Sequence, residues 1–267
     1  MIDTYNDLRF EVNGHVAVIT LNRPEAFNAI SDLMRKELRD VIDRLHKDDS
    51  IRIVIFTGAG KAFCAGGDIK LMKKRIDEGF TYRERLDTYR RDVAGMVKEI
   101  KSIRQLTIAK INGACYGAGC SIAMLCDIRI AAAEVKFGMP FGRRGLVPDW
   151  GALYYLPRLV GASQAIALTA TGRGFDSKKA LNIGFVNEVV PAEELDAFVE
   201  AYCDDILQSS PLSLAESKAA IYAATMSELD TSLEREAQLQ SACYLSDDHR
   251  EGVDCFLEKR PPVFTGK

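Results

Sequence analysis

Residues 110–132 read KINGACYGAGCSIAMLCDIRIAA, and this stretch decides the fold class. Residues 107–113 have the pattern of a buried strand, and the small residues 117–119 follow it. The chain then forms a helix that is apolar on most sides, which predicts that this helix is buried. Residues 128–134, IRIAAAE, have the pattern of a further strand. A buried helix between two strands favours an α/β fold.

The residues before this stretch add a hairpin, two helices and one more strand. Residues 8–14 and 15–22 form two apolar-rich strands joined at Asn13-Gly14, a strong hairpin signal. Residues 31–48 have apolar residues at helical spacing, and Ser31 is their predicted N-cap. Residues 51–58 predict a buried strand, and a long helix begins near Tyr82.

The residues after it become purely helical. Pro211 stands at a favoured first-turn position, and further helices are predicted near 230–244 and 248–259. The expected division is a core over residues 1–190 and a helical region over residues 191–267. Amphipathic helices without a wide core of their own favour oligomerisation.

Composition excludes several classes of function. The net charge of −3 gives no reason to expect binding to nucleic acid or to an anionic membrane. The N-terminus lacks the features of a signal peptide, and the longest apolar run, residues 116–126, is too short to span a bilayer. Seven cysteines without CxxC spacing and three distant histidines make a metal site or a histidine triad improbable. We therefore expect a cytoplasmic protein without a metal.

Two segments of small residues are candidates for ligand binding. Residues 57–70, TGAGKAFCAGGDIK, match neither phosphate-loop pattern, because Ala62 and Phe63 stand at required positions. What remains is a tight backbone at 65–67, where small side chains leave N–H groups open to a ligand. The segment 117–119 begins a helix, whose free N–H groups favour a developing oxyanion. Taken singly, each segment is equally consistent with a turn or with close packing.

Asp149 lies in residues 145–161, GLVPDWGALYYLPRLVG, between Pro148 and the only tryptophan, Trp150. An aspartate before an apolar helical run is a good N-cap, and PDWG is a turn signature. Taken alone, Asp149 is therefore either a helix cap or a catalytic base.

Together the motifs resemble the crotonase superfamily, the enoyl-CoA hydratases and isomerases, and within it the enoyl-CoA and 1,2-epoxyphenylacetyl-CoA isomerases. The residues that carry this resemblance are 18–31, 60–70, 110–132, 136–161, 180–190 and 247–267. The resemblance implies a spiral core of ββα units and a C-terminal helical region that forms a homotrimer or a dimer of trimers. It implies acyl-CoA thioester substrates, with coenzyme A as part of the substrate and no other cofactor. It also implies two backbone amides, those of Ala65 and Ala118, that bind the thioester oxygen.

Departures from the family pattern bear on the reaction. The hydratases of this family use two glutamates, where this chain has Ser121 and Phe141. Hydration needs water activated between two carboxylates, so we expect efficient hydratase activity to be absent. Asp149 matches an aspartate that isomerases of the family use. Related dehalogenases pair it with a histidine, and residues 70–110 contain none.

The resulting expectation is a 3-enoyl-CoA to 2-enoyl-CoA isomerase with Asp149 as the proton shuttle. Apolar neighbours, including Met139, are expected to dry the pocket and raise the pKa of Asp149. The remaining predicted substrate-binding residues are Ala26, Gly66, Gly67, Asp68, Ile69, Gly117, Phe141, Leu146 and Trp150. The alternatives are a hydratase or hydrolase in which Asp149 activates water, and a non-catalytic acyl-CoA-binding or RNA-binding scaffold.

Overall fold

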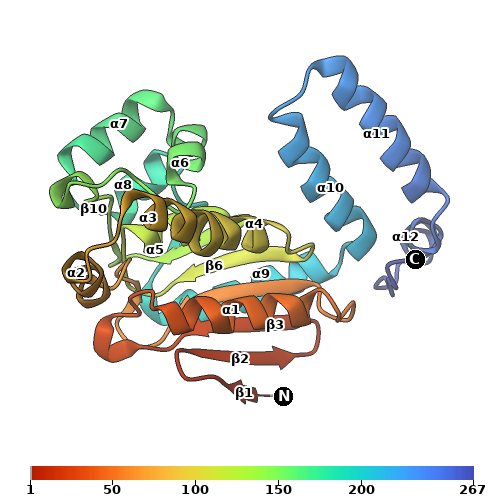
Figure 1. The fold of residues 1–267 in the computed structure, drawn as a ribbon. Coiled ribbons are helices and arrows are strands. Elements are labelled where there is room, and N and C mark those ends of the chain that lie inside the picture. The colour runs from red at the N-terminus through yellow and green to blue at the C-terminus, as the bar shows by residue number, and fades with distance from the viewer. Residues whose placement is uncertain (1) are drawn as a thin grey trace. The chain divides into compact units, whose positions relative to one another are not determined.

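The computed structural model describes residues 2–267 as a mixed α/β protein (Figure 1). The strands are β1 (Ile2–Thr4), β2 (Leu8–Asn13), β3 (Val16–Leu21), β4 (Ile53–Gly58), β5 (Ala62–Cys64), β6 (Leu106–Ile111), β7 (Ala114–Tyr116), β8 (Ile128–Ala132), β9 (Lys136–Gly138), β10 (Phe175–Asp176) and β11 (Glu188–Val190). The helices are η1 (Pro24–Ala26), α1 (Asp32–Leu45), α2 (Ile69–Asp77), α3 (Tyr82–Thr88), η2 (Tyr89–Ala94), α4 (Gly95–Lys101), α5 (Ala118–Leu125), η3 (Gly142–Arg144), α6 (Ala152–Val160), α7 (Ala162–Thr171), α8 (Ser177–Asn182), η4 (Ala192–Glu194), α9 (Leu195–Leu207), α10 (Pro211–Ala224), α11 (Leu229–Tyr244) and α12 (Asp247–Glu258).

The strands form two sheets. The larger has the order β1-β2-β3-β4-β6-β8-β11, and the smaller has the order β10-β9-β7-β5. The pairs β3–β4, β6–β8, β8–β11, β5–β7 and β7–β9 are parallel. The predicted hairpin at Asn13-Gly14 is confirmed, since β2 and β3 pair antiparallel across it and Gly14 has a φ of +56°.

The chain passes repeatedly from the large sheet to the small sheet. It does so in the pairs β4–β5, β6–β7 and β8–β9, and the first two are followed by α2 and α5. This repetition is the ββα core that the resemblance implied. All eight residues of α5 are buried, as its apolar sequence predicted.

Helix α1 is amphipathic and packs against β2 and α4. The Ser31 side chain accepts a hydrogen bond from the Met34 N–H, so the predicted N-cap is confirmed. The residues that α1 buries are mostly apolar, namely Met34, Leu38, Val41, Ile42 and Leu45, together with Arg35 and Glu37.

The long helix predicted from Tyr82 exists, with an irregular middle. Helices α3 and α4 are joined by the π-helical segment η2, and Thr81 closes a capping box with Glu84 at the N-terminal end. Such π segments are uncommon and often occur at functional sites. Here the segment borders the pocket described below.

Contacts divide the chain into two units, residues 2–103 with 107–199, and residues 104–106 with 200–267. The sequence placed this division at residue 190. In the second unit α10 and α11 pack against each other as two legs of a helical hairpin (Figure 1). The buried carboxylate of Asp248 accepts hydrogen bonds from the N–H groups of Thr265 and Gly266, which holds the C-terminal tail against α12. Within residues 2–267, no helix has both the length and the apolar character that crossing a membrane requires.

Candidate active site

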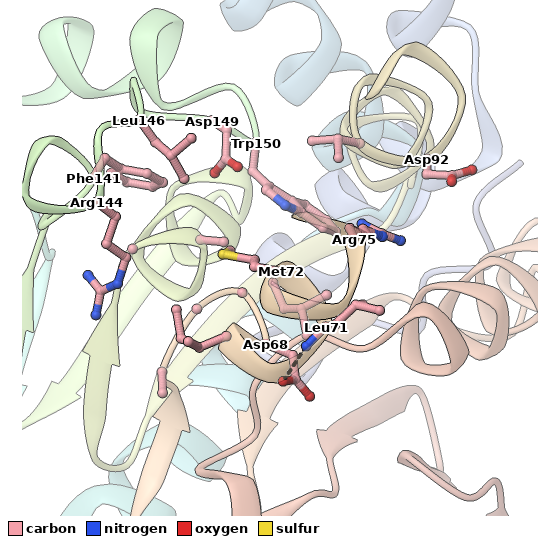
Figure 2. A pocket seen from close by; sticks show the side chains of 18 of the residues that line it. Asp68, Leu71, Met72, Arg75, Asp92, Phe141, Arg144, Leu146, Asp149 and Trp150 are labelled. Atoms are coloured by element: carbon pink, nitrogen blue, oxygen red, sulfur yellow. Dashed lines mark hydrogen bonds between the residues drawn. The ribbon is translucent and has the colours of Figure 1, made fainter. Parts of the chain in front are cut away.

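A pocket in the first unit gathers the segments that the sequence singled out (Figure 2). It brings together the small-residue segments after β5 and β7, the loop before α6, and one side of α2, α3 and η2. The predicted site residues that line it are Ala65, Gly66, Gly67, Asp68, Ile69, Gly117, Ala118, Phe141, Leu146, Asp149 and Trp150. Ala26 does not line this pocket; it ends the short helix η1. Met139 is fully buried in the core and does not line it either.

Asp149 does not cap a helix. The N-cap of α6 is Gly151, and only the backbone carbonyl of Asp149 takes part, as acceptor for the Ala152 N–H. The carboxylate points into the pocket between Leu146 and Trp150 (Figure 2). The sequence left open whether the Asp149 side chain caps a helix or faces a site. The structure shows that it faces the pocket.

The turn that places Asp149 is strained. Trp150 has a φ of +52°, and Gly151 follows with a φ of +79°. The left-handed region is unfavourable for a residue as large as tryptophan and costs on the order of 1–3 kcal/mol. The backbone of Trp150 approaches the Tyr89 hydroxyl in η2 and acts to lower its pKa, against the larger effect of burial. This turn lets Trp150 bury its ring while Asp149 faces the pocket.

Burial dominates the electrostatics of Asp149. Loss of solvent raises its pKa from 3.8 to about 6, although the positive charge of Arg85 and the backbone N–H of Asp149 act in the opposite direction. Its Oδ1 atom is buried and has no hydrogen-bond partner within residues 2–267. A carboxylate with such a pKa is mostly ionised at neutral pH and is a stronger base than an ordinary aspartate.

The other two carboxylates that line the pocket are engaged. Asp68 is the N-cap of α2 and pairs with Arg23, at 3.1 Å from Nη1 to Oδ2. Partial burial acts to raise the pKa of Asp68, but the Arg23 hydrogen bond and the α2 N–H groups hold it below its usual value. Asp92 accepts two hydrogen bonds from Arg91. Among the pocket carboxylates described here, Asp149 alone lacks a side-chain partner at hydrogen-bond distance.

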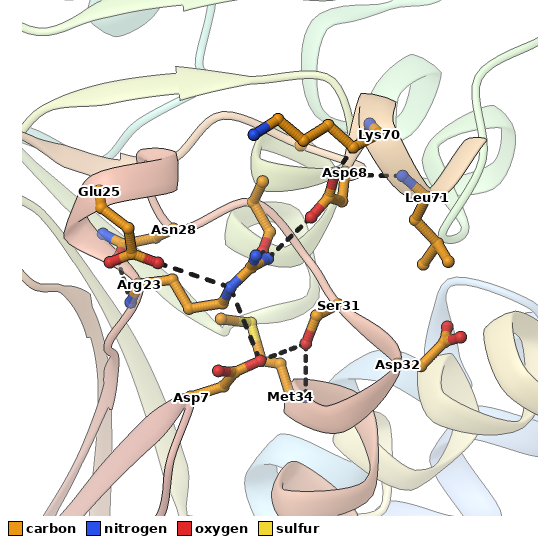
Figure 3. Close-up of polar contacts among 12 residues, drawn as sticks. Asp7, Arg23, Glu25, Asn28, Ser31, Asp32, Met34, Asp68, Lys70 and Leu71 are labelled. Carbon is orange, nitrogen blue, oxygen red and sulfur yellow. Dashed lines mark hydrogen bonds and ion pairs between the residues drawn. The ribbon is translucent and has the colours of Figure 1, made fainter. Parts of the chain in front are cut away.

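The network around Arg23 fixes the first small-residue segment (Figure 3). The Arg23 guanidinium donates to the Ala29 carbonyl at 2.7 Å and lies 3.7 Å from Asp7, which in turn accepts from Ser31. Asn28 is fully buried and donates to the carbonyl oxygens of Ala59 and Ala62. These contacts connect the loop before α1 to both ends of the turn that leads into β5.

The structure corrects one predicted amide of the oxyanion site. The N–H of Ala65 donates to the carbonyl oxygen of Phe27 at 2.9 Å and is therefore not free for a ligand. The next N–H, of Gly66, faces Cys64 Sγ at 3.4 Å. The N–H of Gly67 has no acceptor within residues 2–267, and Gly67 lines the pocket.

The second segment begins α5. Gly117 is its N-cap with a φ of +52°, and its N–H donates to the Gly138 carbonyl at 2.9 Å. Ala118 is the first residue of the helix, where an N–H has no intrahelical acceptor, and none is present elsewhere in the described chain. A Cβ atom on Gly66 would lie 3.3 Å from the Ala118 nitrogen, so the two segments are in contact.

The positions of the two missing glutamates differ in their surroundings. Ser121 is fully buried, and its hydroxyl donates to the Gly117 carbonyl at 3.3 Å, outside the pocket lining. Phe141 lines the pocket and is 7% exposed. Neither position supplies a carboxylate to the pocket.

Sequence reasoning expected residues 70–105 to shape the acyl pocket but named no individual residue of that wall, which α2, α3 and η2 form. Its pocket residues include Met72, Arg75, Arg85, Thr88, Asp92 and Val93. A signal for α2 was present, since Asp68 precedes apolar residues at helical spacing and accepts from the N–H groups of Lys70 and Leu71. The pocket-facing side of α3 carries no motif that sequence alone would distinguish from a solvated helix face.

The family model described as enoyl-CoA hydratase/isomerase matches residues 11–267. A short-chain-enoyl-CoA hydratase from Clostridium acetobutylicum is 35% identical over 259 residues, which are 96% of each chain. The 1,2-epoxyphenylacetyl-CoA isomerase of Escherichia coli is 34% identical over 252 residues, 94% of this chain and 95% of the relative.

Solved structures agree with this assignment. An enoyl-CoA hydratase from Bacillus anthracis superposes with a TM-score of 0.91 at 30% identity, covering 98% of this chain and 100% of its own. An enoyl-CoA hydratase/isomerase from Cupriavidus metallidurans has a TM-score of 0.89 at 31% identity, covering 99% and 98%. The chain therefore belongs to the enoyl-CoA hydratase/isomerase family and is an enzyme of the crotonase superfamily.

Proposed function

We propose that this enzyme is an isomerase that converts 3-enoyl-CoA thioesters to 2-enoyl-CoA thioesters, with Asp149 as its proton-transfer group. The observation that supports this most strongly is the pocket's single carboxylate without a side-chain partner, Asp149, whose pKa burial raises to about 6. Hydration needs a second carboxylate, because one group holds and activates the water and a proton must also be supplied to C2. The two positions where the family's hydratases carry glutamates hold Ser121 and Phe141.

The amides of Gly67 and Ala118 are the proposed donors to the thioester oxygen. Both line the pocket, both lack another acceptor in the described chain, and the segments that carry them touch. Gly67 replaces Ala65 in this role, because the Ala65 N–H is already bound to Phe27. Each donor aimed at a developing oxyanion is worth about 3 kcal/mol in comparable sites.

The reaction then needs two proton transfers and no water. Asp149 accepts a proton from C2, the C2–H electron pair moves into the thioester, and the oxygen becomes an enolate held by the two amides. The electrons then return to form the C2–C3 double bond while the former C3–C4 double bond takes the proton from Asp149 at C4. The carboxylate ends as it began, so one group completes the cycle.

The apolar residues of the pocket support this chemistry by limiting water. Phe141 and Trp150 are nearly buried and line the pocket with Asp149. A dry neighbourhood raises the basicity of the carboxylate and disfavours addition of water to the enoyl product.

Binding of coenzyme A and self-assembly are further parts of the proposal. We place coenzyme A along Ala26 and residues 65–69, next to the Arg23–Asp68 pair. We propose a homotrimer or a dimer of trimers built on the second unit. The second unit exposes large apolar side chains, among them Ile221, Met226, Leu229 and Leu233.

Product analysis of the purified enzyme tests the reaction type. With a 3-enoyl-CoA substrate, we expect 2-enoyl-CoA to accumulate without 3-hydroxyacyl-CoA, because no second carboxylate activates water. Mass spectrometry resolves the two products, since hydration adds the mass of one water. Formation of 3-hydroxyacyl-CoA at a comparable rate would identify a hydratase, and release of free coenzyme A would identify a hydrolase.

The pH profile tests the state of Asp149. A carboxylate must be ionised to act as a base. We therefore expect kcat/KM to stay constant above about pH 6 and to fall about tenfold per pH unit below it. The inflection follows the raised pKa of about 6, where an ordinary aspartate would place it near 3.8. A rate that stays constant down to about pH 4.5 would show that Asp149 is not the titrating base.

A further inference from the structure

The arginines that line the pocket differ in one respect. Arg35 and Arg75 both pair with Asp32, and Arg144 donates to the Pro140 carbonyl. Arg85 also lines the pocket, but its guanidinium forms no hydrogen bond and no ion pair within residues 2–267. It is thus a cation in the pocket wall without a protein counter-ion in contact.

Arg85 lies on α3, lines the pocket and is exposed to solvent. The pocket residues Arg85, Thr88 and Asp92 are spaced three and four residues apart, which places them on one helix face. Of the three, Asp92 is already paired with Arg91. This helix face therefore presents the Arg85 guanidinium and the Thr88 hydroxyl to a ligand in the pocket.

Arg85 and Asp149 share the pocket without touching. The charge of Arg85 reaches Asp149 strongly enough to oppose the rise in its pKa, yet no ion pair forms between them. Leu146 and Val93 line the same pocket. An acyl chain that places its reacting carbons at Asp149 would therefore pass apolar walls before its far end meets a guanidinium.

We propose that Arg85 determines the acyl specificity of this enzyme by pairing with a carboxylate at the far end of the acyl chain. The preferred substrates are then CoA thioesters of dicarboxylic acids. Guanidinium and carboxylate match in geometry, with two parallel N–H···O bonds. The exposed position keeps the cost of desolvating both charges small. The assignment relies on the proposed function only for the location of the thioester and the reacting carbons.

Binding of unreactive saturated esters tests this assignment without relying on catalysis. The probes are hexanoyl-CoA and adipoyl-CoA, which differ only in a methyl or carboxylate terminus, and the eight-carbon pair octanoyl-CoA and suberoyl-CoA. Dissociation constants are measured by calorimetry for the wild type and for Arg85→Gln. Arg83→Gln is the matched control, because it removes the same charge from the same helix outside the pocket lining.

We expect Arg85→Gln to weaken binding of at least one dicarboxylic ester about fivefold, the size of one partly exposed ion pair. Binding of its methyl-terminated counterpart should stay within about twofold, and Arg83→Gln should change neither. Equal weakening of both esters would overturn the proposal and would indicate that Arg85 acts through general packing or stacking. Unchanged binding of both esters would also overturn the proposal. These saturated esters have no double bond to move, so their binding is measured independently of catalysis. If 3-enoyl-CoA showed no double-bond migration, the proposed function would fail, but the binding result for Arg85 would still stand.

Discussion

Replacement of Asp149 by asparagine is expected to lower kcat for double-bond migration by about 10³-fold, within the range for loss of a general base. Asparagine keeps the shape of the side chain and removes its ability to accept and return a proton. Binding of a saturated acyl-CoA should change little, because Asp149 is assigned to the reacting carbons. Initial rates with 3-enoyl-CoA, followed by absorbance of the conjugated product, measure the effect.

The same substitution is expected to stabilise the fold. An aspartate whose pKa is raised from 3.8 to about 6 by burial is harder to ionise in the folded chain than in the unfolded one. At neutral pH this costs up to about 3 kcal/mol, and the cost disappears below pH 4, where the carboxyl is protonated in both states. Urea denaturation of both proteins at pH 7.5 and at pH 4 measures the difference. A less active and more stable Asp149→Asn enzyme excludes unfolding as the cause of lost activity.

Asp87→Asn is the matched control for Asp149→Asn. Asp87 lies on α3 near the pocket but does not line it and is exposed. Its substitution removes one nearby negative charge and should leave kcat within about twofold, since a surface charge contributes little. Full activity of Asp149→Asn would show that another group moves the proton.

Gly119→Ala carries the second large expected effect, on both stability and activity. A Cβ atom at residue 119 would lie 2.2 Å from the Cys64 carbonyl oxygen, so α5 has to move away from β5. The expected loss is about 3 kcal/mol or more, because the clash is with backbone rather than with a flexible side chain. The displacement also moves the Ala118 N–H, and we expect kcat to fall by about 10²-fold. Denaturation curves and initial rates test the two parts separately.

Gly95→Ala gives the contrasting case. Gly95 begins α4 with helical dihedral angles, and a Cβ atom there would meet its nearest neighbour at an ordinary 3.6 Å. This substitution should leave activity unchanged and stabilise the fold by about 0.5–1 kcal/mol, through helix propensity. If Gly119→Ala were as harmless as Gly95→Ala, the close approach of α5 to β5 would not be what positions Ala118.

Local sequence signals were sufficient to predict the features that depend on neighbouring residues. Asn13-Gly14 predicted the hairpin and Ser31 predicted the start of α1, because turns and caps depend on residues a few positions apart. The apolar sequence of α5 predicted its burial, because the composition of the helix itself carries that signal. The ββα core followed from the resemblance of whole motifs rather than from any single pattern.

Contacts between distant segments could not be read from the sequence in the same way. The Ala65 N–H is occupied by Phe27, a residue almost forty positions away, so residue spacing could not distinguish it from the open N–H of Gly67. The backbone of Trp150 approaches Tyr89, which begins a π-helical segment that periodicity does not reveal. Arg85 resembled any solvated arginine until the fold placed it in a pocket wall.

The central claim is that a single sheltered carboxylate moves the proton from one carbon to another. A 3-enoyl-CoA carrying deuterium at C2 tests it most directly, with the product examined by NMR after conversion in ordinary water. We expect part of the deuterium to appear at C4, because Asp149 returns the deuteron that it removed before water exchanges it. A product whose C4 carries hydrogen from water alone would contradict it.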